Sequence, residues 1–248
     1  MHQLCFEVCS TALNYYVINT SDKTVEKSAT LTLKGRIPEL KKEECADLLR
    51  THQLLDFSGN VSLSVSGSKV TLVPQIIFGE SNAKEIFELC FGNSDDLIEH
   101  NRFFEQTLVV VYEIEEWIKR FFVVRYPRVV IQHQTTHLLR GIFQKNSYEP
   151  RLHLSVEDNF CTLILISKSE IIFFNTFDFQ STEDIFYYTM HAWNGSISAE
   201  KKKHFCWHSD AELDENFEAI KGLLEKHFTP KECIFEQISR IKHQLLCV

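Results

Sequence analysis

Glycine is scarce in this sequence, and no two glycines are adjacent. Only 8 of the 248 residues are glycine. Loops that bind a phosphate group need glycine, because a side chain would keep the backbone N–H groups away from the phosphate oxygens. The composition therefore argues against a glycine-rich phosphate-binding loop.

Long apolar runs and an excess of positive charge are also missing. Runs such as Leu108–Tyr112 and Leu163–Ile166 have the length of a strand, far short of the roughly 20 residues that span a bilayer. Residues 1–148 carry 16 Lys+Arg against 18 Asp+Glu, and residues 149–248 carry 10 against 16. Because neither part is basic, we expect no nucleic-acid partner and no insertion into or attachment to a membrane.

The first residues show no basic segment followed by an apolar stretch, so the sequence predicts no signal peptide. We therefore expect a cytoplasmic protein. In a reducing compartment its eight cysteines would remain thiols.

The apolar pattern near the start of the chain recurs 148 positions later. Without a gap, Leu4–Val8 aligns with Leu152–Val156, and Leu13–Ile18 aligns with Cys161–Ile166. Two alternating apolar segments around a short polar break predict a β-hairpin. We therefore expect the same hairpin twice, which indicates an internal duplication.

A third strand and a helix are expected after each hairpin. The third strands lie near Ala29–Leu33 and Ile171–Phe177. Pro38 suits an early position of the first helix, and Ser181 with Asp184 resembles a capping box at the second. Each part therefore opens β-β-β-α, which predicts a mixed α/β fold.

The remaining segments alternate between strand and helix patterns. We expect strands near residues 61–65, 69–73, 107–112, 129–131 and 204–208, and helices near residues 83–90, 114–122, 135–143, 213–224 and 234–245. The stretch Gly92–Asp96 indicates a loop. Asn146–Pro150 marks the boundary between two domains, residues 1–148 and 149–248.

Two parts that each open with a three-stranded meander and a helix resemble the duplicated actin-like (ribonuclease H-like) fold. The segments Leu4–Leu33, Phe103–Phe143 and Leu152–Trp193 are similar to an uncharacterised bacterial family predicted to share the fold of actin, Hsp70 and sugar kinases. The resemblance covers most of the chain and rests on hydrophobic patterns rather than on catalytic motifs. It implies two halves facing a cleft, where ATP would contact both hairpin turns through glycine-containing motifs.

The expected turns depart from that family pattern. Neither Glu7–Ala12 nor Val156–Phe160 contains glycine, and Asn194–Ser196 is the nearest candidate for an adenosine loop. Carboxylates that face a phosphate without N–H donors or a cation would repel it. We therefore expect no cofactor, with ATP and Mg as the alternative. In that alternative the candidate nucleotide-contacting residues are Glu7, Ser10, Thr11, Glu157, Asp158 and Asn159.

Two groups of histidine and cysteine are weak candidates for a metal. His204, Cys206 and His208 alternate on one expected strand and share a face. Neighbours two apart, such as His204 and Cys206, lie roughly 7 Å apart and could share zinc, although a solvated strand face is the favoured interpretation. His133 and His137 span an expected strand-to-helix junction, which indicates a polar junction rather than a metal pair.

Twenty phenylalanines leave room for a few exposed ones, and Phe103-Phe104 and Phe173-Phe174 are the candidates. An exposed apolar patch often marks a protein partner. The favoured hypothesis is therefore a non-catalytic protein-interaction or scaffold protein on a degenerate actin-like fold, similar in role to the cytoplasmic platform proteins of pilus assembly and secretion. The alternative is a divergent nucleotide-binding protein, ATPase or kinase that uses the cleft between the halves.

Overall fold

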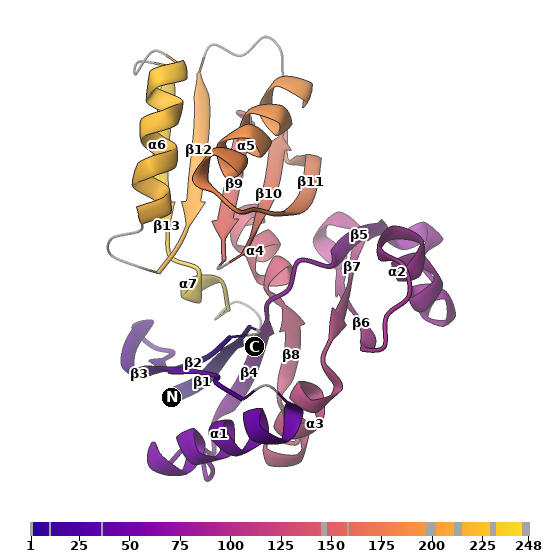
Figure 1. Cartoon of the computed structure of the whole chain (residues 1–248), viewed down its shortest axis with the longest axis vertical. Helices are drawn as coiled ribbons and strands as arrows, with labels where there is room; N and C mark the ends of the chain where they lie inside the picture. Colours follow the sequence, from indigo (N-terminus) through magenta and orange to yellow (C-terminus); the bar gives the residue numbers. More distant parts are fainter. Residues whose placement is uncertain are drawn as a thin grey trace. The chain divides into compact units, whose positions relative to one another are not determined.

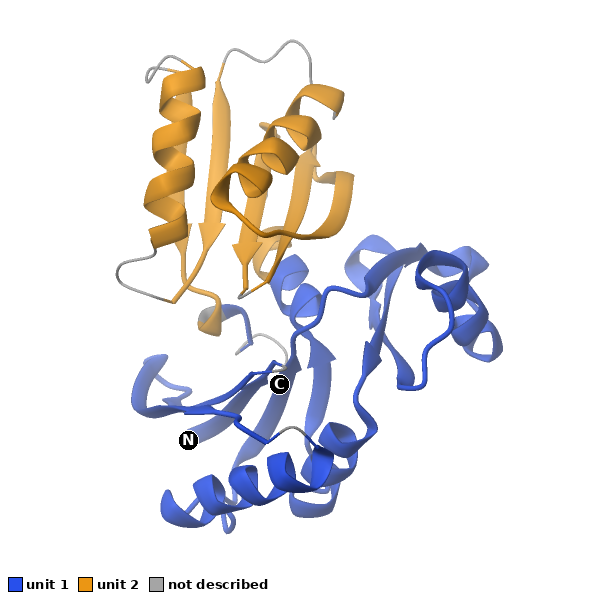
Figure 2. Ribbon diagram, viewed as in Figure 1, with its two compact units in different colours: residues 1–140, 242–248 blue, residues 141–241 orange. Residues whose placement is uncertain are grey.

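The structure is a computed structural model that describes residues 2–9, 11–35, 37–144, 148–157, 159–196, 202–210, 215–228 and 232–244. It divides into two compact units (Figure 2). Unit 1 comprises residues 1–140 with 242–248, and unit 2 comprises residues 141–241. Each unit is built on a five-stranded mixed sheet.

The sheet of unit 1 has the strand order β3-β2-β1-β4-β8 (Figure 1). Its elements are β1 (His2–Val8), β2 (Ala12–Asn19), β3 (Thr24–Thr32), α1 (Pro38–Thr51), β4 (Asn60–Val65), α3 (Glu116–Arg125), β8 (Val130–His133) and α4 (Gln134–Phe143). Phe6 of β1 is fully buried, with its ring centroid 5.0 Å from that of Phe122 on α3. The apolar residues that alternate along β1 thus form the core between the sheet and its helices.

A smaller sheet is inserted between β4 and α3 of unit 1, with the strand order β5-β7-β6. The insertion consists of β5 (Val70–Pro74), η1 (Gln75–Ile77), η2 (Glu80–Asn82), α2 (Ala83–Phe91), β6 (Leu97–Phe103), η3 (Phe104–Gln106) and β7 (Leu108–Ile114). Its own core contains Val73, Phe87, Val109 and Val111. The sequence pattern predicts no strand at β6, because polar residues occupy the middle of that strand.

The sheet of unit 2 has the strand order β11-β10-β9-β12-β13. Its elements are β9 (Arg151–Val156), β10 (Phe160–Ser167), β11 (Glu170–Asp178), α5 (Thr182–Ser196), β12 (Lys203–His208), α6 (Glu215–His227) and β13 (Cys233–Ile238). Trp193 of α5 and Phe205 of β12 meet in the core with ring centroids 5.5 Å apart. The core therefore lies between the sheet and the helices α5 and α6.

The two sheets repeat the same hairpin register. Leu4 lies opposite Val17 in β1 and β2, and Leu152 lies opposite Leu165 in β9 and β10. Both positions are shifted by 148, as the aligned sequence pattern predicts. The third strand has a register irregularity directly after Val17 in unit 1 and directly after Leu165 in unit 2. The duplicated mixed α/β fold is thus confirmed, and a β-bulge that the sequence did not predict lies at the equivalent position of both sheets.

The short helix α7 (Ile241–Gln244) brings the chain back to unit 1. There the side-chain amide of Gln244 donates to the carbonyl oxygen of Phe6 and to Ser62 Oγ, both at 3.0 Å. The amide of Gln3 donates to the same hydroxyl oxygen at 3.1 Å. The buried amide nitrogens of Gln3 and Gln244 thus both find acceptors in unit 1.

Two predictions about the second half are wrong. The helix predicted over residues 234–245 is the strand β13 followed by the four-residue α7. Isoleucines spaced four and three residues apart produced the helical pattern, whereas the segment pairs in parallel with β12. The predicted adenosine loop Asn194–Ser196 is the last turn of α5.

No helix within the described ranges is long and apolar enough to cross a membrane.

Candidate functional site: the duplicated hairpin turns

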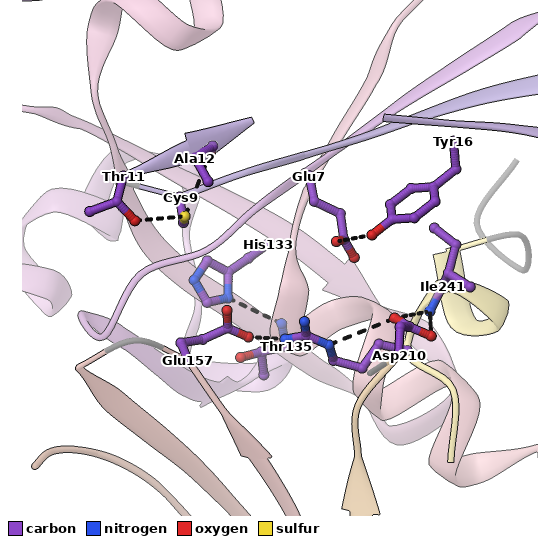
Figure 3. Close-up of polar contacts among 11 residues, drawn as sticks. Glu7, Cys9, Thr11, Ala12, Tyr16, His133, Thr135, Glu157, Asp210 and Ile241 are labelled. Carbon is purple, nitrogen blue, oxygen red and sulfur yellow. Dashed lines mark hydrogen bonds and ion pairs between the residues drawn. The ribbon is translucent and has the colours of Figure 1, made fainter. Parts of the chain in front are cut away.

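The turn between β1 and β2 uses its main-chain groups internally. The N–H of Cys9 donates to the carbonyl oxygen of Ala12 at 3.0 Å, and the N–H of Leu33 donates to that of Thr11 at 2.7 Å. Cys9 Sγ lies 3.6 Å from Thr11 Oγ1 (Figure 3). The turn is therefore closed on itself and tied to the end of β3.

The turn between β9 and β10 has the same main-chain pattern. The N–H of Glu157 donates to the carbonyl oxygen of Phe160 at 2.9 Å, and the N–H of Phe179 donates to that of Asn159 at 3.1 Å. Glu157 is thus the counterpart of Cys9, 148 positions later. The N–H groups of Cys9 and Glu157 are therefore bonded within their own turns, whereas a phosphate-binding loop directs successive N–H groups at its ligand.

The carboxylate of Glu157 has a cationic partner within its own unit. Arg240 Nη1 donates to Glu157 Oε1, and Arg240 Nε lies 3.9 Å from Asp210 Oδ2 (Figure 3). Asp210 in turn accepts the N–H of Ile241 at 3.0 Å and the hydroxyl of Ser239 at 2.5 Å. All three charged side chains are largely buried, with exposed fractions of 16% for Glu157, 23% for Arg240 and 20% for Asp210.

Glu7, the acidic candidate of the first turn, lies on β1 ahead of the turn itself. Its Oε2 accepts a hydrogen bond from the hydroxyl of Tyr16 at 3.3 Å. Among the predicted nucleotide-contacting residues, the structure thus places Thr11 at the first turn and Glu157 and Asn159 at the second, whereas Glu7 lies on β1 just before the first turn. Ser10 and Asp158 lie outside the described residues.

The predicted metal candidates His204 and Cys206 have different neighbours. His204 Nε2 lies 3.2 Å from Glu149 Oε2, and burial lowers the pKa of this histidine. The thiol of the buried Cys206 points to Glu236, with Sγ 4.0 Å from Oε2. In the part of the chain that the structure describes, no three His, Cys, Asp or Glu side chains are grouped as metal ligands.

The junction of His133 and His137 is a buried polar region, as the sequence predicts. β8 ends at His133, whose Nδ1 accepts the N–H of Thr135 at 3.2 Å. Burial lowers the pKa of His133 and of His137 to about 3, so both imidazoles are neutral near pH 7. Asn101 Oδ1 accepts the N–H of His133 at 2.8 Å and the hydroxyl of Thr136 at 3.0 Å.

Arg240, Asp210 and Asn101 were missed by sequence reasoning. Arg240 is 83 residues from Glu157, and Asn101 is 32 residues from His133. No local pattern connects side chains at such separations. Each of these residues is a charged or amide side chain in or beside a strand. Solvated loops commonly carry such side chains too, so their position alone does not indicate a functional site.

The two phenylalanine pairs differ in exposure. Phe103 is fully buried, whereas Phe104 is 66% exposed. Phe173 and Phe174, on β11, are both partly buried, and Phe173 packs against the core of unit 2. Of these four phenylalanines, Phe104 alone is exposed, as the sequence predicts for one or more of them.

In each unit two further strands extend an antiparallel three-stranded meander in parallel, and helices cover the sheet. This duplicated arrangement is that of an actin-like ATPase fold. A crystal structure from Bacteroides thetaiotaomicron VPI-5482, described as a protein with actin-like ATPase fold and unknown function, matches with a TM-score of 0.84 at 14% identity, covering 100% of this chain and 96% of that chain. The chain belongs to DUF3822, a family of proteins of unknown function, whose model matches residues 1–226.

Two further solved structures share the fold at low identity. The PilM–PilN type IV pilus biogenesis complex matches with a TM-score of 0.57 at 10% identity, covering 98% of this chain and 90% of that one. The cytoplasmic domain of EpsL, an inner membrane component of the type II secretion system of Vibrio cholerae, matches with a TM-score of 0.51 at 11% identity, covering 99% and 93%. Comparison with curated protein sequences finds no match.

Proposed function

We propose that this chain is a non-catalytic protein-interaction component built on a degenerate actin-like ATPase fold. The observation that carries the proposal is the ionic group Glu157–Arg240–Asp210 at the second turn. A carboxylate that organises a nucleotide-bound cation needs oxygen atoms that face the ligand site and are not neutralised by a cationic side chain. Here an arginine of the same unit already compensates that charge.

The main chain of both turns supports the same proposal. The N–H groups of Cys9 and Glu157 donate to carbonyl oxygens within their turns, so they are not oriented toward a phosphate. Proteins of the same fold also occur in assemblies: one solved neighbour is a PilM–PilN complex and another is a component of a secretion system. A role as a platform for another protein is consistent with these neighbours.

A melting experiment with nucleotide tests the proposal. A ligand present at 100 times its Kd stabilises the folded state by about 2.7 kcal/mol, which raises Tm by several degrees. We expect no shift with millimolar ATP and magnesium, measured beside an ATP-binding sugar kinase as a positive control. A shift of several degrees, together with slow release of phosphate, would contradict the proposal.

The alternative is a divergent nucleotide-binding protein that uses Glu7 and Thr11 at the first turn. The hydrogen bond from Tyr16 orients the Glu7 carboxylate, which is the observation in favour of this alternative. If nucleotide binding is found, Glu7→Gln should make that binding independent of magnesium, whereas Arg240→Met should leave the magnesium dependence of binding unchanged.

A further inference from the structure

The strand β11 forms one edge of the sheet in unit 2, and β3 forms the corresponding edge in unit 1. Within the described ranges, β11 pairs with β10 alone and β3 pairs with β2 alone. An open edge presents unpaired backbone groups to other chains, and proteins usually protect such edges with charged residues or bulges. The residues at the bulge of each edge strand indicate whether that edge is protected.

In β3 the bulge position carries a charge. Val17 lies opposite Lys27 and Ile18 lies opposite Val25, which leaves Glu26 as the additional residue. Glu26 forms an ion pair with His2 at 3.1 Å. With adjacent acidic and basic side chains in the strand, this edge has the usual protection against pairing with another chain.

In β11 the same bulge carries an apolar residue. Leu165 lies opposite Phe173 and Ile166 lies opposite Ile171, which leaves Ile172 as the additional residue. Its side chain is 45% exposed. Because Lys27 and Phe173 pair with the equivalent positions Val17 and Leu165, corresponding residues of β3 and β11 are 146 apart. Glu26 and Lys27 are thus replaced by Ile172 and Phe173.

A hydrogen bond just after the end of β11 shows which of its backbone groups point toward β10 and which point away. The N–H of Phe179 donates inward to the carbonyl oxygen of Asn159, and inward bonding recurs at every second residue of an antiparallel strand. The N–H and C=O of Phe174 therefore point away from β10. At Thr176, another outward position, the N–H donates to the side-chain oxygen of Asn175 at 2.9 Å rather than to β10.

The charges at the two ends of β11 limit which strand could pair with it. Glu170 and Asp178 are the first and last residues of the strand, and the residues between them are uncharged. Antiparallel pairing of two copies would place Glu170 opposite Asp178, and parallel pairing would place each acid opposite itself. Like charges directly opposite each other are destabilising, so a second copy of this chain is a poor partner.

We propose that β11 is a docking edge at which an extended segment of a partner protein, apolar in the middle and carrying lysine or arginine at both ends, adds a sixth strand to the sheet of unit 2. Main-chain hydrogen bonds to Phe174 would supply affinity, and the acids at the ends would select the basic partner. The proposal deepens the proposed interaction function and rests on it.

A peptide probe with a matched pair of variants tests this docking edge. The probe is a fluorescein-labelled peptide of alternating valine and threonine with a lysine at each end, followed by fluorescence anisotropy. Phe174→Pro removes an outward N–H and leaves the pairing with β10 in place, as proline on an edge strand does. Ser28→Pro makes the corresponding change in β3. We expect saturable binding to the wild type, at least tenfold weaker binding to Phe174→Pro, and no change for Ser28→Pro.

Further measurements distinguish the effect of peptide charge, and of variant misfolding, from the loss of main-chain hydrogen bonds at β11. A peptide with glutamate ends should bind at least fivefold more weakly than the lysine peptide, and the difference should shrink in high salt. Hydrogen exchange at the Phe174 amide should slow only when the peptide is present. Circular dichroism identifies a misfolded variant, in which case Ile172→Lys, which places a charge of the same sign as the ends of the probe on the edge strand, replaces Phe174→Pro and should likewise weaken binding.

Three outcomes would contradict the proposed docking edge. The wild type would show no saturable binding, Ser28→Pro would weaken binding as much as Phe174→Pro does, or the glutamate peptide would bind more tightly than the lysine peptide. A wild-type dimer that Phe174→Pro converts to a monomer in sedimentation would show that a second copy occupies the edge instead. The nucleotide melting experiment on the same samples is independent, so an ATP shift together with phosphate release would contradict the non-catalytic role without affecting the peptide result.

Discussion

The first hairpin turns of the two units share their main-chain hydrogen bonds and differ in side-chain electrostatics. In unit 1 the turn has a thiol and a hydroxyl 3.6 Å apart, at Cys9 and Thr11. In unit 2 the same backbone position carries Glu157, which pairs with an arginine. The comparison shows that the strand register of a duplicated fold can persist after the chemistry at its turns has diverged. Four predictions test how far this equivalence extends.

The largest effect is expected in the two cores. Phe6 and Leu154 occupy equivalent positions, and their exposed fractions are 0% and 1%. We expect Phe6→Ala to lower the free energy of unfolding by about 3–5 kcal/mol and Leu154→Ala by about 2–5 kcal/mol, because each leaves a cavity. Urea unfolding followed by tryptophan fluorescence measures both. An effect under 1 kcal/mol at only one position would break the equivalence of the cores.

Acid should destabilise unit 1 through its buried histidines. His133 and His137 have a pKa of about 3 when folded against 6.5 for the free side chain. Unfolding therefore takes up protons at acidic pH, so stability is constant above about pH 7 and falls as the pH drops from 6.5 toward 3. Between pH 7 and 5 the loss is about 2 kcal/mol per histidine.

Chemical unfolding at several pH values checks this acid dependence. The double variant His133→Gln, His137→Gln should show a shallower slope between pH 7 and 5 than the wild type. A wild type whose stability does not change over this range would show that the two histidines take up protons in the folded protein as readily as in the unfolded chain.

A smaller effect is expected at the ionic group of unit 2. Arg240→Met leaves Glu157 and Asp210 largely buried without their cation, which should cost about 1–3 kcal/mol. The double variant Arg240→Met, Glu157→Met should recover part of that loss, because no carboxylate then remains at the turn itself. Thermal unfolding of the four members of the cycle gives the coupling energy. A coupling near zero would mean that solvent already screens the pair.

The smallest effect is expected at the turn of unit 1. Cys9→Ser keeps a group able to donate to Ala12 and removes only a weak sulfur contact with Thr11. The free energy of unfolding should change by less than about 0.5 kcal/mol. A loss as large as that of Arg240→Met would show that the two turns contribute equally, against the comparison drawn above.

The sequence predicted the parts of the fold that depend on local alternation. The hairpins of both units follow from period-two patterns whose apolar face is buried, because a slip of one residue would expose the core side chains. The cross-strand register itself, such as Leu4 opposite Val17, comes from the structure. Strands with polar residues at their centres were not predicted. His100 and Asn101 interrupt the pattern of β6, and Glu236 interrupts that of β13.

The candidate site was predicted less well than the fold. Glu7, Thr11, Glu157 and Asn159 were identified from their place in the predicted turns, which depends only on the strand register. The partners of these residues were not predictable, because Arg240 and Glu157 are 83 residues apart in the sequence and no local pattern connects them. Electrostatic pairing between distant segments leaves no periodic signal in a single sequence.

The return of the chain through α7 has a consequence for synthesis on the ribosome. Gln244 donates to the carbonyl oxygen of Phe6 and to Ser62, yet it is translated more than a hundred residues after the rest of unit 1. While unit 2 is being synthesised, the carbonyl oxygen of Phe6 in nascent unit 1 lacks its Gln244 donor. The hydrogen-bond network of this sheet is therefore completed only after unit 2 has been translated.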